Sequence, residues 1–259
     1  MELDSLWKID TYTATDQGTR EYQQDAAKVI TDGNSALAVL CDGMGGLKYG
    51  EMASNQTVQH FLRDMEEAWP VKNLPSFLEE EARRMDRMVC NLTDREHHKL
   101  DAGTTLVSAV VRENRLYWMS VGDSRLYILR DKRLKCLTKD HNYKIMLQEK
   151  LNEGKVDMDF YNSEIGRGEA LTSYLGMGNI SLIDKNESPF MLKRDDILLL
   201  CSDGLYKTLT EEQIEVVISE SGGSISLAGD RLLKTAGRWG RKGQDNTTVI
   251  LLKVNEEQR

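Results

Sequence analysis

Apolar residues form two kinds of run along the chain, and each kind predicts a different element. Residues 37–41, Leu-Ala-Val-Leu-Cys, are continuously apolar, which is typical of a strand that is covered on both faces. In residues 49–65, and again in 77–92, apolar side chains recur at helical spacing. These two segments therefore predict amphipathic helices whose apolar faces pack on the core.

Shorter apolar runs separated by polar turns follow the second of these helices. They predict strands at residues 104–111, 116–121, 125–130 and 134–137. The turns between them, Glu113-Asn114, Gly122-Asp123 and Asp131-Lys132, are short. Because short turns join antiparallel neighbours, we expect a meander of consecutive hairpins in an antiparallel sheet.

The later part of the chain returns to strands and adds two helices. Strands are predicted at residues 181–192, 196–201 and 247–254. The spacing Thr210-Glu-Glu-Gln213 is that of a capping box and predicts a helix start, and a further helix is expected over 226–239. Strands at both ends with helices between them favour an α+β fold, a central β-sandwich of two antiparallel sheets flanked by helices, over a doubly wound parallel sheet.

Residues from about 140 to 175 differ from the rest of the chain. They carry many charges and show little periodicity beyond a short helix near 143–151. Such a composition is typical of a surface excursion, so we expect a mobile flap here. No stretch resembles a linker, and the 259 residues predict a single domain, 1–259, that includes the flap.

Composition and charge narrow the classes of protein. The net charge of -8 argues against a nucleic-acid partner, because binding along a phosphate backbone is favoured by a positively charged protein. The first residues lack the pattern of a secretion signal, and no apolar run is long enough to span a membrane, so we expect a cytoplasmic protein. Cys41, Cys90, Cys136 and Cys201 are far apart and are interpreted as reduced core residues.

Three carboxylates stand where an apolar run gives way to a tight turn: Asp42, Asp123 and Asp203. A strand end holds its side chain with little freedom, and several such ends that converge would bind hard cations through oxygen ligands. Glycine after Asp42 fits this, since Gly43 lets the backbone approach a ligand and leaves its carbonyl free to face a metal. The residues therefore predict a metal-dependent hydrolase.

Plain turn chemistry is the alternative for each of these residues. Asp-Gly is also the commonest hairpin signal, and Asp32-Gly33 is interpreted as a hairpin turn alone. Asp123 and Asp245 could cap turns, and Asp25 could be a solvated charge. Taken one residue at a time, these alternatives stay open.

Taken together, the motifs resemble those of one family. They are Thr15-Asp-Gln-Gly-Thr-Arg20-Glu-Tyr-Gln-Gln-Asp25-Ala, Asp42-Gly-Met-Gly-Gly46, Gly103-Thr-Thr105, Val121-Gly-Asp-Ser-Arg125, Leu137-Thr-Lys-Asp-His141, Leu171-Thr-Ser-Tyr-Leu-Gly176, Leu200-Cys-Ser-Asp-Gly-Leu205 and Asp245-Asn-Thr-Thr248. In this order they resemble the metal-dependent serine/threonine protein phosphatases of type 2C, in their compact bacterial form, over residues from about 13 to 254. The sandwich fold of that family agrees with the pattern of strands.

The resemblance implies a centre of two Mg²⁺ or Mn²⁺ ions. Asp42 would bridge both ions, Asp25 and the carbonyl of Gly43 would hold one, and Asp203 and Asp245 would hold the other. A water between two such cations would attack the phosphorus directly. Arg20 matches the arginine that holds the phosphate, which a planar guanidinium suits.

Other positions carry weaker implications. Asp123 and Asp203 match the pair that binds a third, weaker ion in relatives. Asp16 could orient Arg20 or a metal-bound water, and Asn246 could hold the metal site by hydrogen bonds.

Three departures from the family pattern stand out. Gln23-Gln24 precedes Asp25 where many relatives have Asn-Glu or Asn-Gln, so the first turn could pack differently. Met44 stands where animal relatives have a histidine and cannot supply a proton to the leaving group. Asp195-Asp196 replaces a Gly-Asp pair, and aspartate tolerates a left-handed turn better than most residues.

These inferences lead to one expected activity and two rivals. We expect a phosphatase that removes phosphate from serine or threonine of phosphoprotein substrates, opposes a serine/threonine kinase acting on the same targets, and is a monomer. A phosphohydrolase of small phosphate esters is the first rival. A silent, partner-binding pseudophosphatase is the second, and it is disfavoured because four mutually repelling carboxylates would have no use there.

Overall fold

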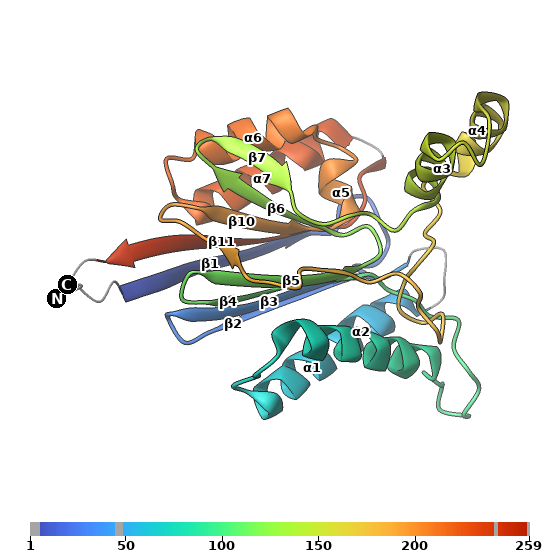
Figure 1. Ribbon diagram of the computed structural model, residues 1–259, viewed down its shortest axis with the longest axis horizontal. Coiled ribbons are helices and arrows are strands. Elements are labelled where there is room, and N and C mark those ends of the chain that lie inside the picture. Colours follow the sequence, from blue (N-terminus) through green and yellow to red (C-terminus); the bar gives the residue numbers. More distant parts are fainter. Residues whose placement is uncertain (1–5, 45–48, 241–242, 258–259) are drawn as a thin grey trace.

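Two antiparallel sheets face each other at the centre of the computed structural model, and helices cover their outer faces (Figure 1). The structure describes residues 6–44, 49–240 and 243–257. One sheet has the order β1 (Leu6–Asp16), β11 (Thr247–Glu257), β10 (Ile197–Cys201), β6 (Arg125–Arg130) and β7 (Arg133–Cys136). The other has the order β2 (Asp25–Thr31), β3 (Ser35–Asp42), β4 (Leu106–Arg112), β5 (Arg115–Val121) and β8 (Asp184–Lys185), with β9 (Phe190–Met191) also paired to β5. The predicted α+β sandwich is confirmed.

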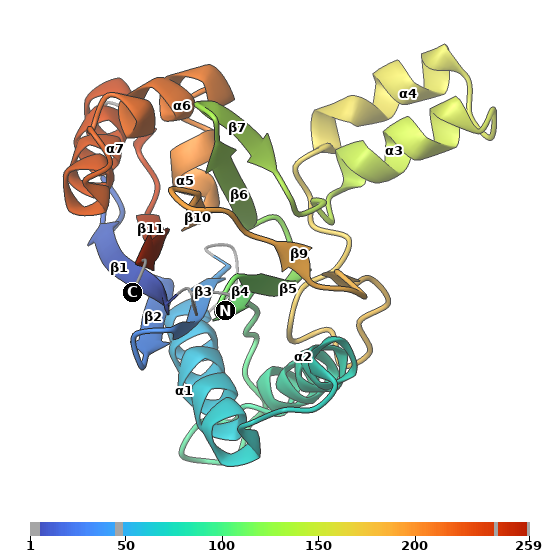
Figure 2. The same ribbon diagram turned by 60° about the vertical axis from the view of Figure 1, so that its left-hand side comes forward.

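The helices form one layer on each outer face and a projection at one end. Against the sheet of β3 lie α1 (Gly50–Ala68) and α2 (Leu74–Cys90). Against the sheet of β10 lie α5 (Asp203–Tyr206), α6 (Glu211–Ser219) and α7 (Ile225–Gly240). The projection contains α3 (Tyr143–Asn152), α4 (Met158–Glu164) and the short turn η1 (Ile165–Arg167), and it extends away from the sandwich (Figure 2). No helix in the described ranges is long and apolar enough to cross a membrane.

The four layers explain why β10, and β3 between its two end residues, are apolar at every position. In β10, Leu198 and Leu200 face the other sheet, whereas Leu199 and Cys201 face the helices α5, α6 and α7. β3 divides in the same way between the opposite sheet and the helices α1 and α2. Because successive side chains of a strand point to opposite faces, a strand with a packed layer on each side needs no polar positions.

The inter-sheet core predicts a large cost for truncating one of its side chains. Leu200→Ala is expected to lower the free energy of unfolding by about 3 kcal/mol, because Leu200 is fully buried between rigid sheets that cannot close the cavity. Urea denaturation measures this change. Val216→Ala on α6, where the side chain is exposed, is the control and should change the free energy by no more than about 0.5 kcal/mol. Equal effects of the two changes would contradict this account of the core.

The predicted meander is wrong at one turn. β4 pairs with β5 and β6 pairs with β7, but β5 and β6 belong to different sheets. The chain crosses between the sheets at Gly122, where φ is +104° and an added Cβ would lie 2.7 Å from the Thr105 side chain. Only glycine fits this crossing. It places the following residue, Asp123, at the end of the sandwich between the two sheets.

Two further segments differ from expectation. The strand predicted over 181–192 is two short strands, because the Asn186 side chain takes over backbone pairing with β5: its Oδ1 accepts the Trp118 N–H and its Nδ2 donates to the Leu116 carbonyl. The helix α4 was not predicted, since none of its side chains is buried and it has no apolar stripe. The left-handed backbone conformation expected at Asp195 is confirmed by its φ of 67°.

The flap segment is anchored to the sandwich at its base. The His141 N–H donates to the Gly122 carbonyl, and the Thr172 N–H donates to the His141 carbonyl. Between these anchors, α3 and α4 pack on η1 and on each other. That this segment moves as a flap within a single domain stays a prediction.

Candidate metal centre

Asp25 and Asp42 lie directly opposite each other at one end of the β2–β3 ladder. Like charges at facing positions of an antiparallel pair repel each other. The Asp25 carboxylate is buried; its Oδ2 accepts a hydrogen bond of 2.7 Å from the Ser202 hydroxyl, whereas its Oδ1 has no partner. A buried carboxylate oxygen without a donor is costly, and a cation beside it would satisfy it.

The backbone of Asp42 is fixed by two threonines. The Thr105 hydroxyl accepts the Asp42 N–H at 2.9 Å, and the Thr105 N–H and the Thr104 hydroxyl both donate to the Asp42 carbonyl at 2.9 Å. Asp42 therefore reaches the end of the sheet on a backbone with little freedom, as an ordered metal ligand requires.

Gly43 is packed too closely to carry a side chain. A Cβ at this position would lie 2.4 Å from the Gly50 carbonyl oxygen and 2.7 Å from that of Gln24. Its N–H donates to the same Gln24 carbonyl. Glycine at this position was predicted to let a ligand approach the backbone. In the structure it is required because the backbone of Gly50 and Gln24 lies against it. The remaining glycines of the motif, Gly45 and Gly46, lie outside the described residues.

The strands β10 and β11 bring two further carboxylates to the same end. Asp203 opens α5 directly after β10 ends, and Asp245 precedes β11. Ser202 links β10 and β11 to Asp25. Its hydroxyl accepts the Thr248 N–H of β11 at 2.9 Å and donates to the Asp25 carboxylate.

Asn246 holds the loop that carries Arg20. Its Oδ1 accepts the Gln24 N–H, and its Nδ2 donates to the carbonyls of Gln17 and Tyr22. The Arg20 guanidinium forms an ion pair with Asp245, and both side chains are partly exposed. The role suggested for Asn246 in holding the site thus has a structural counterpart.

Asp16 and Gln23 both shape this first turn. The Asp16 carboxylate accepts the Gly18 N–H at 2.7 Å instead of contacting Arg20. Gln23 accepts the Asp25 N–H through Oε1 and donates to the Thr15 hydroxyl through Nε2. The unusual glutamine is therefore built into the turn and sets the start of β2.

Asp123 is buried where the chain crosses between the sheets. Its carbonyl accepts the Tyr206 hydroxyl at 3.0 Å. The Tyr206 ring stacks under the Arg125 guanidinium at 3.7 Å, and that guanidinium makes two hydrogen bonds to Asp140 at 3.0 and 2.8 Å. This network ties the Asp123 corner to α5 and to the base of the flap segment.

Most of the predicted site residues line one cavity of about 160 Å³. Asp25 does not line it but is buried opposite Asp42. The lining residues are Arg20, Gln24, Asp42, Gly43, Met44, Thr105, Asp123, Glu169, Leu171, Asp203, Lys207, Asp245 and Asn246. The structure thus brings Arg20 and the predicted carboxylates together from segments far apart in the sequence.

The carboxylates raise one another's pKa values. Burial, followed by the charges of Asp203 and Asp245, raises the pKa of Asp25 to about 6, although the Ser202 and Thr248 hydroxyls lower it. Desolvation and the facing Asp25 raise the pKa of Asp42 well above its usual range. Burial and then Asp203 raise the pKa of Asp123 to about 6. Concentrated negative charge of this kind is the setting in which a divalent cation binds strongly.

Asp25, Asp203 and Asp245 each contact another side chain of the protein, and the carboxylates do not surround one common point as the ligands of a bound ion would. Arg20 pairs with Asp245, Lys207 pairs with Asp203, and Ser202 binds Asp25. Within the described ranges, no three His, Cys, Asp or Glu side chains are arranged to hold one ion together. Even so, the donor set fits Mg²⁺ or Mn²⁺, since it consists of hard carboxylate oxygens and includes the unpaired Asp25 Oδ1.

Sequence reasoning missed three residues of this site: Ser202, Glu169 and Lys207. Ser202 belongs to the motif Leu200-Cys-Ser-Asp-Gly-Leu205, and its position just before Asp203 at a strand end was the signal for it. Glu169 gave no signal, and Lys207 showed only its spacing of four residues from Asp203, because Lys207, Asp123 and Glu169 come from separate segments of the chain.

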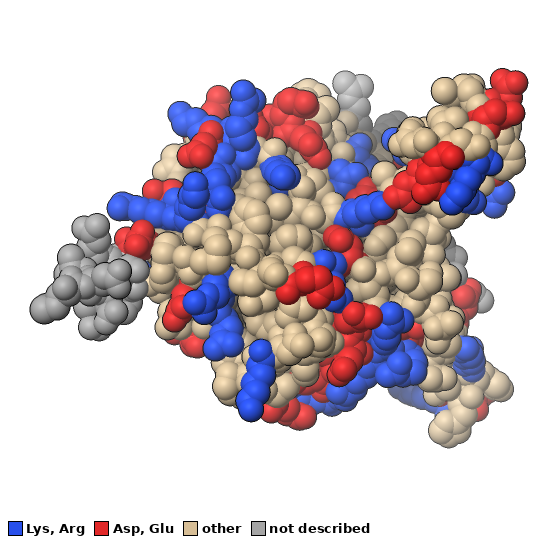
Figure 3. Space-filling model, viewed as in Figure 1, with Lys and Arg blue, Asp and Glu red and all other residues tan. Residues whose placement is uncertain are grey.

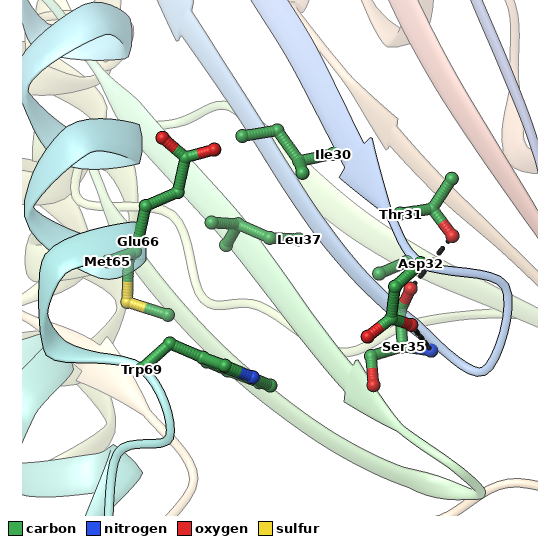
Figure 4. A pocket seen from close by; sticks show the side chains of 9 residues that line it. Ile30, Thr31, Asp32, Ser35, Leu37, Met65, Glu66 and Trp69 are labelled. Carbon is green, nitrogen blue, oxygen red and sulfur yellow. Dashed lines mark hydrogen bonds between the residues drawn. The ribbon is translucent and has the colours of Figure 1, made fainter.

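A separate cavity of about 210 Å³ lies at the opposite end of β3 from Asp42. Ile30, Leu37, Met65 and Trp69 give it an apolar wall between the β2–β3 turn and the end of α1 (Figure 4). Asp32 at its rim accepts hydrogen bonds from the turn, as a plain hairpin residue does. Asp32-Gly33 is thus a structural turn, as predicted.

Acidic and basic side chains are interspersed over the face of the molecule seen in Figure 3. Such a mixture differs from the basic stripe by which a protein follows a phosphate backbone. It agrees with the expectation that nucleic acid is not a partner, which stays a prediction.

Opposed antiparallel sheets with a carboxylate-lined cavity at one end fit a metal-dependent hydrolase. The sequence matches the protein phosphatase 2C family over residues 16–223. The chain belongs to this family.

Curated proteins and solved structures agree with this membership. The serine/threonine phosphatase stp of Listeria welshimeri is 30% identical over 255 residues, which cover 95% of this chain and 96% of the relative. The catalytic domain of the serine/threonine protein phosphatase PstP, solved in complex with two manganese ions, has a TM-score of 0.74 and 27% identity, covering 96% of this chain and 99% of that one. Stp1 from Staphylococcus aureus has a TM-score of 0.76 and 26% identity, covering 98% of this chain and 97% of its own.

Proposed function

We propose that this chain hydrolyses phosphoserine and phosphothreonine in proteins at the carboxylate-lined cavity, with two divalent cations. One observation carries this proposal: Asp25 and Asp42 face each other across a ladder, and one Asp25 oxygen is buried without a donor. A protein gains nothing from this arrangement unless a cation satisfies it. The relatives are named serine/threonine phosphatases, and one of them is solved with two manganese ions.

The proposed ligands would divide between two ions. Asp42 would contribute to holding both, Asp25 and the carbonyl of Gly43 would hold the first, and Asp203 and Asp245 would hold the second. When bound, the ions would supply an activated water and would stabilise the charge that develops on the phosphate. Either Mg²⁺ or Mn²⁺ suits oxygen ligands of this kind.

Arg20 is proposed to hold the phosphate. Its guanidinium lies at the mouth of the cavity on the loop fixed by Asn246, and it pairs there with Asp245. Its side chain is half exposed, so it can turn to the phosphate oxygens without breaking a buried contact. Once a cation neutralises Asp245, the guanidinium is free to bind two phosphate oxygens.

The Asp123 corner is proposed to affect the second ion through Asp203. The resemblance to the family implies a third, weaker ion at this pair of carboxylates. Here the two side chains share one neighbour, Lys207, at 3.5 Å from Asp123 and 2.8 Å from Asp203. Any third ion between them would have to displace this ammonium group.

The biological setting follows from the activity. We expect the protein to act in the cytoplasm as a monomer and to reverse the action of a serine/threonine kinase on shared targets. Residues 1–259 are proposed to form one catalytic domain with the flap segment as its variable part.

Hydrolysis of a phosphothreonine peptide by the purified protein tests the activity. With Mn²⁺ or Mg²⁺ we expect release of phosphate that a chelator abolishes, and faster turnover of the peptide than of a small ester such as glycerol phosphate. Preference for the small ester would favour the metabolite phosphohydrolase. Folded protein that binds Mn²⁺ but releases no phosphate from either substrate would favour the pseudophosphatase.

A further inference from the structure

Lys207 lies in the middle of the acidic side chains at the Asp123 corner. Its Nζ is 2.8 Å from Asp203 Oδ2, 3.2 Å from Glu169 Oε2 and 3.5 Å from Asp123 Oδ2. Three segments of the chain thus place a carboxylate on one ammonium group. Among the described residues, Lys207 is the cationic side chain with an ion pair to Asp123 or to Asp203.

The exposure of the three carboxylates shows which contacts matter. The Glu169 side chain is 65% exposed, so its ion pair is screened by water and contributes little. The Asp123 side chain is only 6% exposed and the Asp203 side chain 20%. Because water cannot neutralise the buried Asp123, a cation next to it has a large effect on its energy.

The lysine is held in this position by its own helix. Its N–H donates to the Asp203 carbonyl, so that Lys207 and Asp203 are neighbours on one helical turn. The preceding residue, Tyr206, is fixed by its hydroxyl on the Asp123 carbonyl and by the Arg125 guanidinium over its ring. The base of the lysine side chain is therefore placed by packed groups before any metal binds.

An ammonium group and a divalent ion cannot share this position. Mg²⁺ binds oxygen at about 2.1 Å, so an ion bridging Asp123 and Asp203 would take nearly the volume that Nζ occupies. Two positive charges at such a distance would also repel each other strongly in a partly buried site. Either the lysine or the ion is present.

We infer that the Lys207 ammonium group acts as a built-in cation between Asp123 and Asp203 and takes the place of a third metal ion. The inference rests on the proposed function, because it assumes that Asp203 also holds one of the two catalytic ions. It makes Lys207 a positioning residue, which keeps Asp203 directed toward that ion and balances the charge of Asp123. It also makes the chain independent of the high metal concentrations that a weak third ion would need.

Counting bound Mn²⁺ without substrate tests this directly. Free Mn²⁺ is followed by electron paramagnetic resonance while the metal alone is titrated into wild-type protein, Lys207→Met, Lys207→Arg and the double variant Lys207→Met with Asp123→Asn. We expect two ions on the wild type and on Lys207→Arg, which keeps the charge. Lys207→Met should bind a third ion at least roughly tenfold more tightly than the wild type does, a typical coupling between neighbouring sites.

The double variant identifies the location of the third ion. Loss of that ion when Asp123 becomes Asn would confirm that it sits between the two carboxylates. The inference is overturned if the wild type already binds a third ion as tightly as Lys207→Met does, or if Lys207→Met binds no more ions than the wild type. Absence of the two tighter ions from every protein would instead overturn the proposed function, and the inference with it. Circular dichroism of each variant verifies that the fold is intact.

Discussion

Asp42→Asn is expected to reduce kcat/KM for a phosphothreonine peptide by roughly a thousandfold or more while the protein stays folded. Asp42 is the carboxylate proposed to face both ions, and losing its charge removes several kcal/mol of transition-state stabilisation, about 1.4 kcal/mol for each factor of ten. The backbone groups of Asp42 keep their hydrogen bonds to Thr104 and Thr105, because these do not involve its side chain. Peptide hydrolysis with Mn²⁺, with circular dichroism alongside, measures both effects.

The same β-hairpin provides a matched control. Asp32 is also an aspartate followed by glycine, but it lies at the other end of β3 and its carboxylate caps the turn by accepting the N–H groups of Asn34 and Ser35. Asp32→Asn should leave kcat/KM within about twofold, since asparagine serves this turn equally well. Comparable losses in the two variants would mean that the metal role proposed for Asp42 is wrong.

Sequence patterns could predict Asp42 and Asp203 because strand ends are strongly marked, whereas Asp25 and Asp245 were implied only by the resemblance to the family. The continuous apolar runs before Asp42 and Asp203 required layers on both faces, and the structure provides them in the opposite sheet and the outer helices. The facing of Asp25 and Asp42 was not predicted. It depends on the register of the β2–β3 hairpin, and its turn, from Asp32 to Ser35, is compatible with more than one pairing.

The crossing at Gly122 and the position of Lys207 could not be predicted from the pattern of neighbouring residues. Gly122-Asp123 has the length and composition of a hairpin turn, yet the chain crosses there to the other sheet, where Gly122 packs against Thr105 just before β4. Lys207 shows only its helical spacing from Asp203 until Asp123 and Glu169 are placed beside it. Tertiary contacts decide both cases.

The second large effect is expected in the absence of metal: stability in chelator should rise as pH falls from about 7.5 to 4.5. The folded state raises the pKa of Asp25 from 3.8 to about 6, chiefly through burial. A carboxyl group with a raised pKa binds its proton more tightly in the folded state than in the unfolded state. Its contribution is therefore largest below the unfolded pKa and is lost as pH rises through 6.

The size of this contribution follows from the shift. About two pKa units correspond to roughly 3 kcal/mol, and Asp123, with its pKa also raised to about 6, adds to the effect. Asp25→Asn should therefore raise the free energy of unfolding in chelator at pH 7.5 and flatten its dependence on pH between 7.5 and 4.5. Urea denaturation of both proteins in chelator at several pH values measures this.

Saturating Mn²⁺ should reverse the order of the two proteins. A metal ion binds the ionised carboxylates of the folded state, so the wild type gains stability as pH rises, whereas Asp25→Asn has lost a ligand and gains less. The carboxylate that destabilises the metal-free fold would then be the one that stabilises the loaded enzyme. Wild-type protein that is more stable than Asp25→Asn at pH 7.5 in chelator would show that Asp25 is satisfied within the protein alone. In that case its unpaired, buried oxygen would no longer support a metal at this position.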